Sequence, residues 1–168
     1  TGSFGNTFSY KGLKLNVFMT YSFGNKIRLD PVFKASYSDL DAMPKEFKNR
    51  WMMPGDERYT HVPVITSKRQ QQKNNSLSYA YNAYNNSDVR VADGGFIRMK
   101  EISLSYDFPK KLITKIGFNS LSMKVQGTNL FLIYADDKLN GQDPEFFRSG
   151  GVAAPVPKQF TFTLRLGL

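Results

Sequence analysis

The chain has 168 residues, with 23 lysines and arginines against 14 aspartates and glutamates, which gives a formal net charge of +9. It contains no cysteine, so a disulfide scaffold, a thiol nucleophile, an iron–sulfur cluster and a cysteine-ligated zinc site are excluded. The single histidine, His61, excludes a metal site with several histidine ligands. No apolar run approaches the roughly 18 to 20 residues that a transmembrane helix needs, so a helical membrane protein is excluded as well.

The first two segments predict a β-hairpin. From Leu13 to Gly24 apolar side chains at odd positions alternate with mostly polar ones at even positions. Only a strand separates two such sets, because a helix would scatter them around its circumference. The segment from Phe4 to Tyr10 alternates as well, and Lys11-Gly12 provides a two-residue turn between the two strands.

Three further segments, at about 96–108, 119–132 and 160–168, predict strands by the same alternation. In the last of them Phe160, Phe162 and Leu164 alternate with threonine and arginine. The early half of the first, Phe96 to Met99, departs from the pattern.

The connections between these strands alternate between short and long. The turns at Lys11-Gly12 and at about 109–117 are short, whereas 25–95 and 133–158 are long. Soluble β-sandwiches rarely alternate short and long connections in this way, because the connections in compact domains have a median length of about 4 to 6 residues. Outer-membrane barrels combine short periplasmic turns with long external loops, and their strands need roughly 9 to 11 residues to cross the bilayer.

The two faces of the strands point to the same class of protein. One face carries leucine, valine, methionine and aromatic residues, and the other carries lysine, asparagine, serine and threonine, as in a barrel with a watery lumen. Aromatic residues near the strand ends suit the membrane interface. The alternative is a soluble β-sandwich carbohydrate-binding module with a buried aromatic face, which would purify from the cytosol without detergent.

Four places in the chain carry motifs of a known family. They are Arg50-Trp51 with Pro54-Gly55-Asp56-Glu57, the run from Asp93 to Pro109, Thr128-Asn129-Leu130-Phe131, and Asp143-Pro144-Glu145 followed by Pro155-Val156-Pro157-Lys158. In order, spacing and content they resemble the C-terminal part of SusC/RagA-type, TonB-linked (TonB-dependent) outer-membrane transporters.

The resemblance implies an all-β fold, an antiparallel transmembrane β-barrel segment that supplies about five strands of a larger barrel. Residues 1–168 would form the C-terminal portion of that barrel, with 25–95 and 133–158 as long extracellular loops. Five strands cannot close a barrel, and open edges are costly in lipid. We therefore expect the edges at Gly2–Tyr10 and Gln159–Leu168 to pair with another polypeptide, or to be artificially exposed where that polypeptide is absent.

The resemblance also implies a function and a set of partners. The whole protein would import oligosaccharides or peptides across the outer membrane of a Gram-negative bacterium, with a SusD-like surface lipoprotein as a lid. Its further partners would be the rest of the barrel and the plug, in the same or a separate chain, the TonB complex through an N-terminal part, and outer-membrane lipid. No enzymatic activity, catalytic residue, cofactor or metal site is predicted.

Two groups of residues are candidates for roles in transport. The residues expected to face the lumen are Lys14, Asn16, Thr20, Ser22, Glu101, Ser103, Ser105, Lys124, Gln126, Thr128, Thr163 and Arg165. The aromatic residues expected to stack on ligand are Trp51, Tyr79, Tyr81, Tyr84 and Phe146. Packing within the loops is an equally open role for each aromatic residue.

Other candidate chemistry is weaker. His61 has no serine or cysteine partner nearby in sequence, which favours a surface role. Oxygen-bearing residues between Asp136 and Glu145 suggest calcium, but the EF-hand template fails because Phe147 stands where the bidentate glutamate belongs. The positive charge is spread along the chain, which favours anionic membrane lipid over nucleic acid as its partner.

Overall fold

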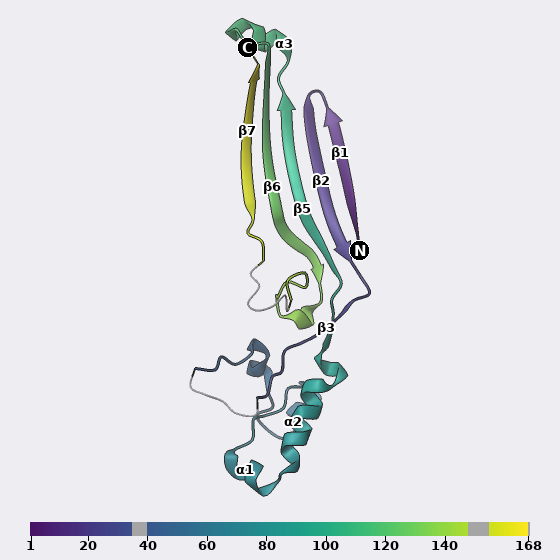
Figure 1. Ribbon diagram of the computed structural model, residues 1–168, viewed down its shortest axis with the longest axis vertical. Coiled ribbons are helices and arrows are strands. Elements are labelled where there is room, and N and C mark those ends of the chain that lie inside the picture. Colours follow the sequence, from purple (N-terminus) through teal and green to yellow (C-terminus); the bar gives the residue numbers. More distant parts are fainter. Residues whose placement is uncertain (35–39, 148–154, 168) are drawn as a thin grey trace. The chain divides into compact units, whose positions relative to one another are not determined.

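The computed structural model describes residues 1–34, 40–147 and 155–167 and divides into two compact units (Figure 1). The first, here called the sheet unit, comprises Thr1–Asn25, Gly94–Asp136 and Asp143–Leu168. The second, here called the loop unit, comprises Lys26–Asp93 and Asp137–Gln142. Residues 35–39 and 148–154, within the predicted loops, and Leu168 of the last predicted strand lie outside the described residues.

The sheet unit contains one antiparallel sheet of five strands in the order β1-β2-β5-β6-β7. The strands are β1 (Gly2–Tyr10), β2 (Leu13–Ser22), β5 (Phe96–Asp107), β6 (Ser120–Ala135) and β7 (Gln159–Gly167). The alternation in the sequence predicted all five, and the structure extends the fourth of them by three residues beyond Leu132. In the described part of the chain, β1 and β7 each have a neighbour on one side only, so both edges are open.

The β1–β2 turn uses two residues with left-handed backbone conformations. Lys11 has φ 46° and Gly12 has φ 86°, the pattern of a turn whose twist matches the twist of the flanking strands. A Cβ atom on Gly12 would lie 2.7 Å from the carbonyl oxygen of Asp107. Glycine is therefore required at this position by conformation and by space.

A β-bulge explains why the early half of β5 departs from the alternation. Phe18 of β2 pairs with Glu101 and Met19 pairs with Met99, so Lys100 has no partner in the register. One extra residue moves every following side chain to the opposite face, because side chains in a strand alternate with a period of two. Ile97 and Met99 consequently share a face with Ile102 and Leu104.

The β5–β6 connection is a compact helical turn. It contains α3 (Lys110–Ile113) and the 3-10 helix η4 (Thr114–Ile116), and it ends at Gly117, whose φ is 83°. Ile113 is buried, and the amide of Phe118 donates to its carbonyl at 3.3 Å. The turn thus has its own small apolar anchor at the end of the sheet where the short connections lie.

The loop unit has secondary structure and a core of its own. Its elements are β3 (Lys26–Arg28), η1 (Lys45–Asn49), η2 (Asp56–Arg58), α1 (Lys68–Lys73), α2 (Ser76–Asn86), η3 (Asp88–Arg90), β4 (Val91–Asp93) and η5 (Asp137–Leu139). Strands β3 and β4 pair antiparallel. Val32, Phe33 and Val62 form the core, and the rings of Tyr81 and Tyr84 pack against them.

A buried arginine fixes the loop unit internally. The Arg90 side chain is 2% exposed and forms a two-pronged ion pair with Glu46, through Nη1 to Oε2 at 2.5 Å and Nη2 to Oε1 at 2.9 Å. Nη2 also donates to the carbonyl of Asp30 at 2.5 Å. Burial acts to lower the pKa of Arg90, but the Glu46 carboxylate outweighs it and the net shift is upward. Arg90 therefore stays charged and links three segments of the unit.

The helices of the described residues are short and amphipathic or polar. None of them reaches the length and apolar character that would carry a helix across a bilayer.

Candidate functional site

The register of the sheet collects the predicted polar residues on one face. Directly paired residues of antiparallel strands share a face. Lys14 pairs with Ser105, which pairs with Lys124, and Lys124 pairs with Thr163. Asn16, Ser103 and Gln126 form the next row, and Glu101 pairs with Thr128. We call this side the polar face.

The polar face carries side-chain interactions across strands. Lys14 Nζ pairs with Asp107 Oδ2 at 2.9 Å, and Asn16 Nδ2 donates to Glu101 Oε1 at 3.4 Å. A hollow of about 340 Å³ lies on this face. Of the predicted residues, it is lined by Lys14, Asn16, Ser103, Ser105, Lys124, Thr163 and Arg165. The prediction omitted Thr7, Asp107, Ser122 and Met123, which line the hollow as well.

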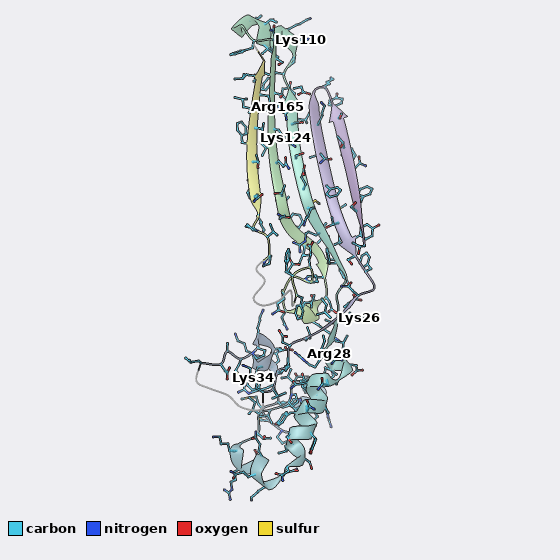
Figure 2. The ribbon with its side chains drawn as sticks, viewed as in Figure 1. Lys26, Arg28, Lys34, Lys110, Lys124 and Arg165 are labelled. Carbon is cyan, nitrogen blue, oxygen red and sulfur yellow. The ribbon has the colours of Figure 1, made fainter. Side chains whose placement is uncertain are left out.

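The hollow is electropositive. Lys124 lies on β6 and Arg165 on β7, near the end of the sheet that carries Lys110 (Figure 2). Among the described residues, Asp107 is the only acidic residue that lines the hollow, and it pairs with Lys14 rather than with Lys124 or Arg165. The small serine and threonine side chains between these cations leave room for a polar ligand or a polar protein segment.

The other predicted polar residues lie further along β2. Thr20 pairs with Arg98 and Ser22 pairs with Phe96, in the rows beyond the bulge. The polar face therefore continues past Lys100, and Arg98 belongs to it.

Arg98 of the polar face makes contacts with several residues that follow β6. Its side chain is 6% exposed, and its Nη2 donates to the carboxylate of Asp143, which is 8% exposed. Its Nε lies 3.0 Å from Oε2 of Glu145, and the guanidinium lies 5.9 Å from the ring centroid of Phe146. Arg98 thus holds the segment after β6 against the sheet. The Asp143 carboxylate belongs to the oxygen-bearing segment that fails the EF-hand template, and it is engaged by this arginine. Among the described residues there is no group of three or more potential metal ligands.

The opposite side of the sheet, which we call the apolar face, is exposed. One row across all five strands contains Phe8, Leu15, Leu104, Val125 and Phe162. Phe8 is 58% exposed, Val125 52% and Phe162 60%. Monomeric soluble proteins rarely leave such a large continuous apolar surface in contact with water. This face therefore requires lipid or protein as its neighbour.

The predicted aromatic residues have different surroundings. The Trp51 Nε1 donates to the carbonyl of Thr60 at 2.8 Å. The Tyr81 hydroxyl donates to the carbonyl of Val64 at 2.6 Å, and the Tyr84 ring packs edge-on against Phe33 at 5.6 Å between centroids.

Burial raises the pKa of the Tyr84 hydroxyl, although the nearby Arg90 favours the phenolate. Tyr79 differs from Tyr81 and Tyr84, which are partly buried, because it is 77% exposed. It is the member of the predicted set with the most ring surface available to a ligand.

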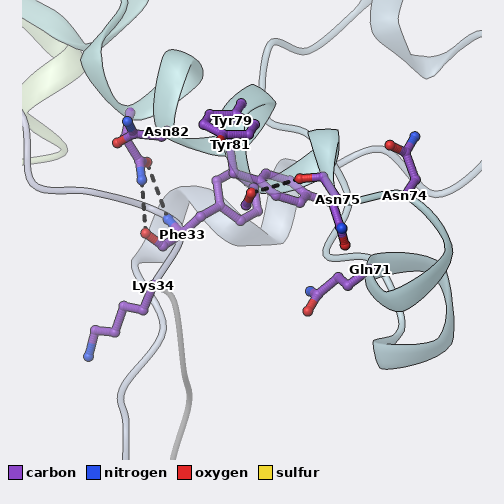
Figure 3. Close-up of a pocket in the computed structure, with 10 residues that line it drawn as sticks. Phe33, Lys34, Gln71, Asn74, Asn75, Tyr79, Tyr81 and Asn82 are labelled. Atoms are coloured by element: carbon purple, nitrogen blue, oxygen red, sulfur yellow. Dashed lines mark hydrogen bonds between the residues drawn. The ribbon is translucent and has the colours of Figure 1, made fainter.

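The loop unit contains a pocket of about 550 Å³ beside α2, here called the amide pocket (Figure 3). Its aromatic residues are Phe33, Tyr79 and Tyr81, and its amide residues are Gln71, Asn74, Asn75, Asn82 and Asn85; Lys34 and Ser78 complete it. Figure 3 shows the rings of Phe33, Tyr79 and Tyr81 between Asn82 on one side and Asn74 and Asn75 on the other. The sequence prediction included the two tyrosines but not the amides, because asparagines in a polar segment, even as the pairs Asn74-Asn75 and Asn85-Asn86, carry no specific signal for a binding site.

The turn from Trp51 to Thr60 is tightly hydrogen-bonded. Its two ends are joined by the Trp51 amide, which donates to the carbonyl of Val62 at 3.0 Å. The Asp56 carboxylate accepts from the amides of Met52 at 2.8 Å and Met53 at 2.9 Å, and these bonds lower the pKa of Asp56. This motif of the sequence therefore forms a preorganised turn. His61, next to it, is exposed.

Comparison with known proteins shows which proteins have sequences similar to this chain. No protein-family model matches the chain. The chain is 30% identical over 158 residues to TonB-dependent receptor P39 of Formosa agariphila, a match that covers 92% of this chain and 14% of the receptor. It is 26% identical over 145 residues to TonB-dependent receptor P3 of the same organism, covering 86% of this chain and 12% of that receptor.

Solved structures show the same fold. The RagAB peptide importer in its open-open state aligns over 99% of this chain and 17% of that chain, with a TM-score of 0.64 and 22% identity. The closed-closed state aligns over 96% of this chain with a TM-score of 0.59 and 21% identity. Both sets of proteins are receptors or importers rather than enzymes, in agreement with the sequence prediction.

The chain spans about a seventh of the length of the first of these receptors. Its antiparallel sheet is accordingly a segment of a larger transmembrane barrel, and the fold class predicted from the sequence is confirmed. The chain belongs to the TonB-dependent receptor family and corresponds to the C-terminal part of a SusC/RagA-type member.

Proposed function

We propose that the protein containing this chain imports oligosaccharides or peptides across the outer membrane of a Gram-negative bacterium. The chain contributes a sector of the barrel wall through the sheet unit and an extracellular surface through the loop unit. The observation that carries the proposal is the division of one five-stranded sheet into a polar face and an exposed apolar face.

In this proposal the apolar face contacts lipid and the polar face lines the lumen. A transmembrane barrel requires apolar side chains outside and tolerates polar and charged ones inside. The exposed Phe8, Val125 and Phe162 suit the first environment, and Lys14, Lys124 and Arg165 suit the second. The open edges of β1 and β7 would pair with the neighbouring strands of the full barrel.

The partners follow from the family. A SusD-like lipoprotein would cover the extracellular side, where 25–95 and 133–158 form loops, and a plug and the TonB complex would drive release into the periplasm. The similar solved structures are those of the RagAB peptide importer, which supports the proposal of a partner protein. Trp51, Tyr79, Tyr81, Tyr84 and Phe146 remain the proposed aromatic contacts, and Tyr79 has the most exposed ring among the four tyrosine and tryptophan members.

The test is deletion of the gene for the full-length receptor in its native bacterium. We expect the deletion strain to lose growth on at least one oligosaccharide or peptide mixture as sole carbon source, and a plasmid copy to restore it. The receptor itself is expected in the outer-membrane fraction, at a mass several times 19.1 kDa, together with a lipoprotein. Recovery of the protein from the cytosol without detergent would overturn the proposal and favour the soluble sandwich.

A further inference from the structure

We propose that the amide pocket of the loop unit binds a neutral saccharide unit. This inference rests on the proposed import function and names the substrate class that the pocket recognises. The pocket lies entirely within the loop unit and has a volume of about 550 Å³, which falls in the range of roughly 300 to 1,000 Å³ typical of small-ligand sites.

The polar lining matches hydroxyl groups. A side-chain amide both donates and accepts hydrogen bonds, as a sugar hydroxyl does. The side-chain oxygen of Asn74 accepts from Ser76 N at 3.0 Å, and that of Asn82 accepts from Asn86 Nδ2 at 3.0 Å. Within the described residues, the amino groups of Asn74 and Asn82 are left available. The Asn75 side chain makes no hydrogen bond to the described residues, so both its amino group and its oxygen are available to a ligand.

The charge of the lining favours a neutral ligand. No carboxylate lines the pocket among the described residues, so a cationic group would find no counter-ion there. Lys34 is the one charged lining residue, and its Nζ pairs with Asp41 Oδ1 at 2.7 Å. Hydrogen bonding and ring contact, rather than ion pairing, are therefore the means of recognition that this pocket offers.

The floor of the pocket is fixed before any ligand binds. The Asn85 side chain accepts from the amides of Val32 at 3.1 Å and Phe33 at 3.3 Å and donates to the Phe33 carbonyl at 2.8 Å. The Phe33 ring lies 4.5 Å from the Tyr81 ring, centroid to centroid. A fixed floor reduces the conformational entropy that binding would otherwise cost.

Tyr79 supplies the surface on which a sugar ring would lie. Its side chain is 77% exposed and belongs to the pocket lining. An aromatic ring offers a broad apolar face together with a polar hydroxyl, and a pyranose likewise presents an apolar face and polar edges. Amides around an exposed tyrosine thus fit both kinds of surface of a saccharide.

The experiment is calorimetric titration of the purified full-length receptor with neutral hexasaccharides of glucose, galactose, mannose and xylose. The pocket variants are Tyr79→Ala and Asn75→Ala. The control is Tyr59→Ala, which removes a tyrosine that is 89% exposed in the same unit but does not line the pocket. We expect at least one hexasaccharide to bind, each pocket variant to weaken it by about tenfold, and the control to change affinity by less than about twofold.

Three results would overturn the inference. They are no binding of any hexasaccharide, unchanged affinity in both pocket variants, and loss of affinity in the Tyr59→Ala control equal to that in Tyr79→Ala. Binding of a neutral pentapeptide that only the pocket variants weaken, with no hexasaccharide bound, would assign the pocket to peptide and also overturn the saccharide class. Growth of the receptor deletion strain separates this failure from a failure of the import proposal, because it does not depend on the pocket variants.

Discussion

The sheet unit and the loop unit place their apolar residues in opposite ways. Among the described residues, the buried hydrophobic side chains of the loop unit are Leu29, Val32, Phe33, Val62, Ala92 and Leu139, whereas those of the sheet unit are Phe96 and Ile113. The sheet instead exposes large side chains such as Phe8, Tyr10 and Phe160. The loop unit therefore encloses an apolar core of its own, together with the buried charge of Arg90.

This difference shows where each unit obtains its stability. Burial of apolar surface within the chain stabilises the loop unit. The sheet unit satisfies its backbone hydrogen bonds between strands, but its apolar face gains stability only from surroundings that the chain does not supply. Substitutions in the loop unit should therefore act through packing and ion pairs, and substitutions in the sheet through the environment of each face.

The largest effect is expected at the buried ion pair of the loop unit. Replacing Arg90 by alanine leaves the Glu46 carboxylate without its partner, and breaking a buried pair in this way costs about 3 to 5 kcal/mol. The measurement is hydrogen exchange of residues 26–93 in the full-length receptor, followed by mass spectrometry. We expect Arg90→Ala to accelerate exchange throughout this segment.

The matched control for Arg90 is the exposed pair Lys26–Asp93. Its atoms lie 3.0 Å apart and its side chains are 63% and 40% exposed, so Lys26→Ala should cost about 1 kcal/mol or less. Equal acceleration in both variants would show that Arg90 has no special role in the unit.

The second effect tests the two faces of the sheet at adjacent positions. Val125 lies on the apolar face and is 52% exposed, and Gln126 pairs with Ser103 on the polar face. A lysine at a lipid-facing midplane position costs about 2 to 4 kcal/mol, so Val125→Lys should lower the folded fraction of the receptor in the outer membrane. The measurement is the heat-modifiable band of the receptor on electrophoresis, with Gln126→Lys as the control that assembles normally. Equal tolerance of the two lysines would contradict the assignment of the faces.

The sequence was sufficient to predict the sheet but not the interior of the loop unit. The alternation from Leu13 to Phe23 is visible in the sequence because successive side chains of a strand point to opposite faces, and each face here has its own polarity. The bulge at Lys100 hid the alternation of early β5, since a shift of register is set by the neighbouring strands and not by the residue itself. Helix α1 was missed although Ser67 and Gln70 form a capping box, which is a local signal. Helix α2 was missed because its faces are largely polar and Tyr81 and Tyr84 pack against residues distant in sequence.

The candidate site divides in the same way. Lys14, Lys124 and Arg165 were predicted because strand parity alone places them on the polar face. Arg98 was recognised only as part of a family motif, and its partners Asp143 and Glu145 lie far along the chain. Pairings of this kind depend on tertiary structure, so the pattern of a single segment does not reveal them.

A smaller effect concerns the turn that joins β1 and β2. Gly12→Ala places a side chain at φ 86°, which costs an L-residue roughly 1 to 2 kcal/mol. The added Cβ would also lie 2.7 Å from the Asp107 carbonyl oxygen, whereas a Cβ on Gly24, at φ 87°, meets nothing within 4 Å. We expect Gly12→Ala to lower the thermal midpoint of the full-length receptor more than Gly24→Ala does. A larger shift for Gly24→Ala would mean that the contact with β5 does not limit this turn.

The smallest effect is a local pH dependence in the turn from Trp51 to Thr60. Hydrogen bonds from the backbone amides of Met52 and Met53 lower the pKa of Asp56 below its ordinary value. Because the folded pKa is depressed, the stabilisation is complete above the unfolded pKa and is lost as the pH falls through the folded pKa. Hydrogen exchange of the peptide 51–60, corrected for intrinsic rates, should therefore accelerate below about pH 4. Asp56→Asn should exchange faster at neutral pH and lose this acid dependence, whereas Glu57→Gln, which keeps both Asp56 bonds, should retain it. An acid response that persists in Asp56→Asn would assign the titration to another group.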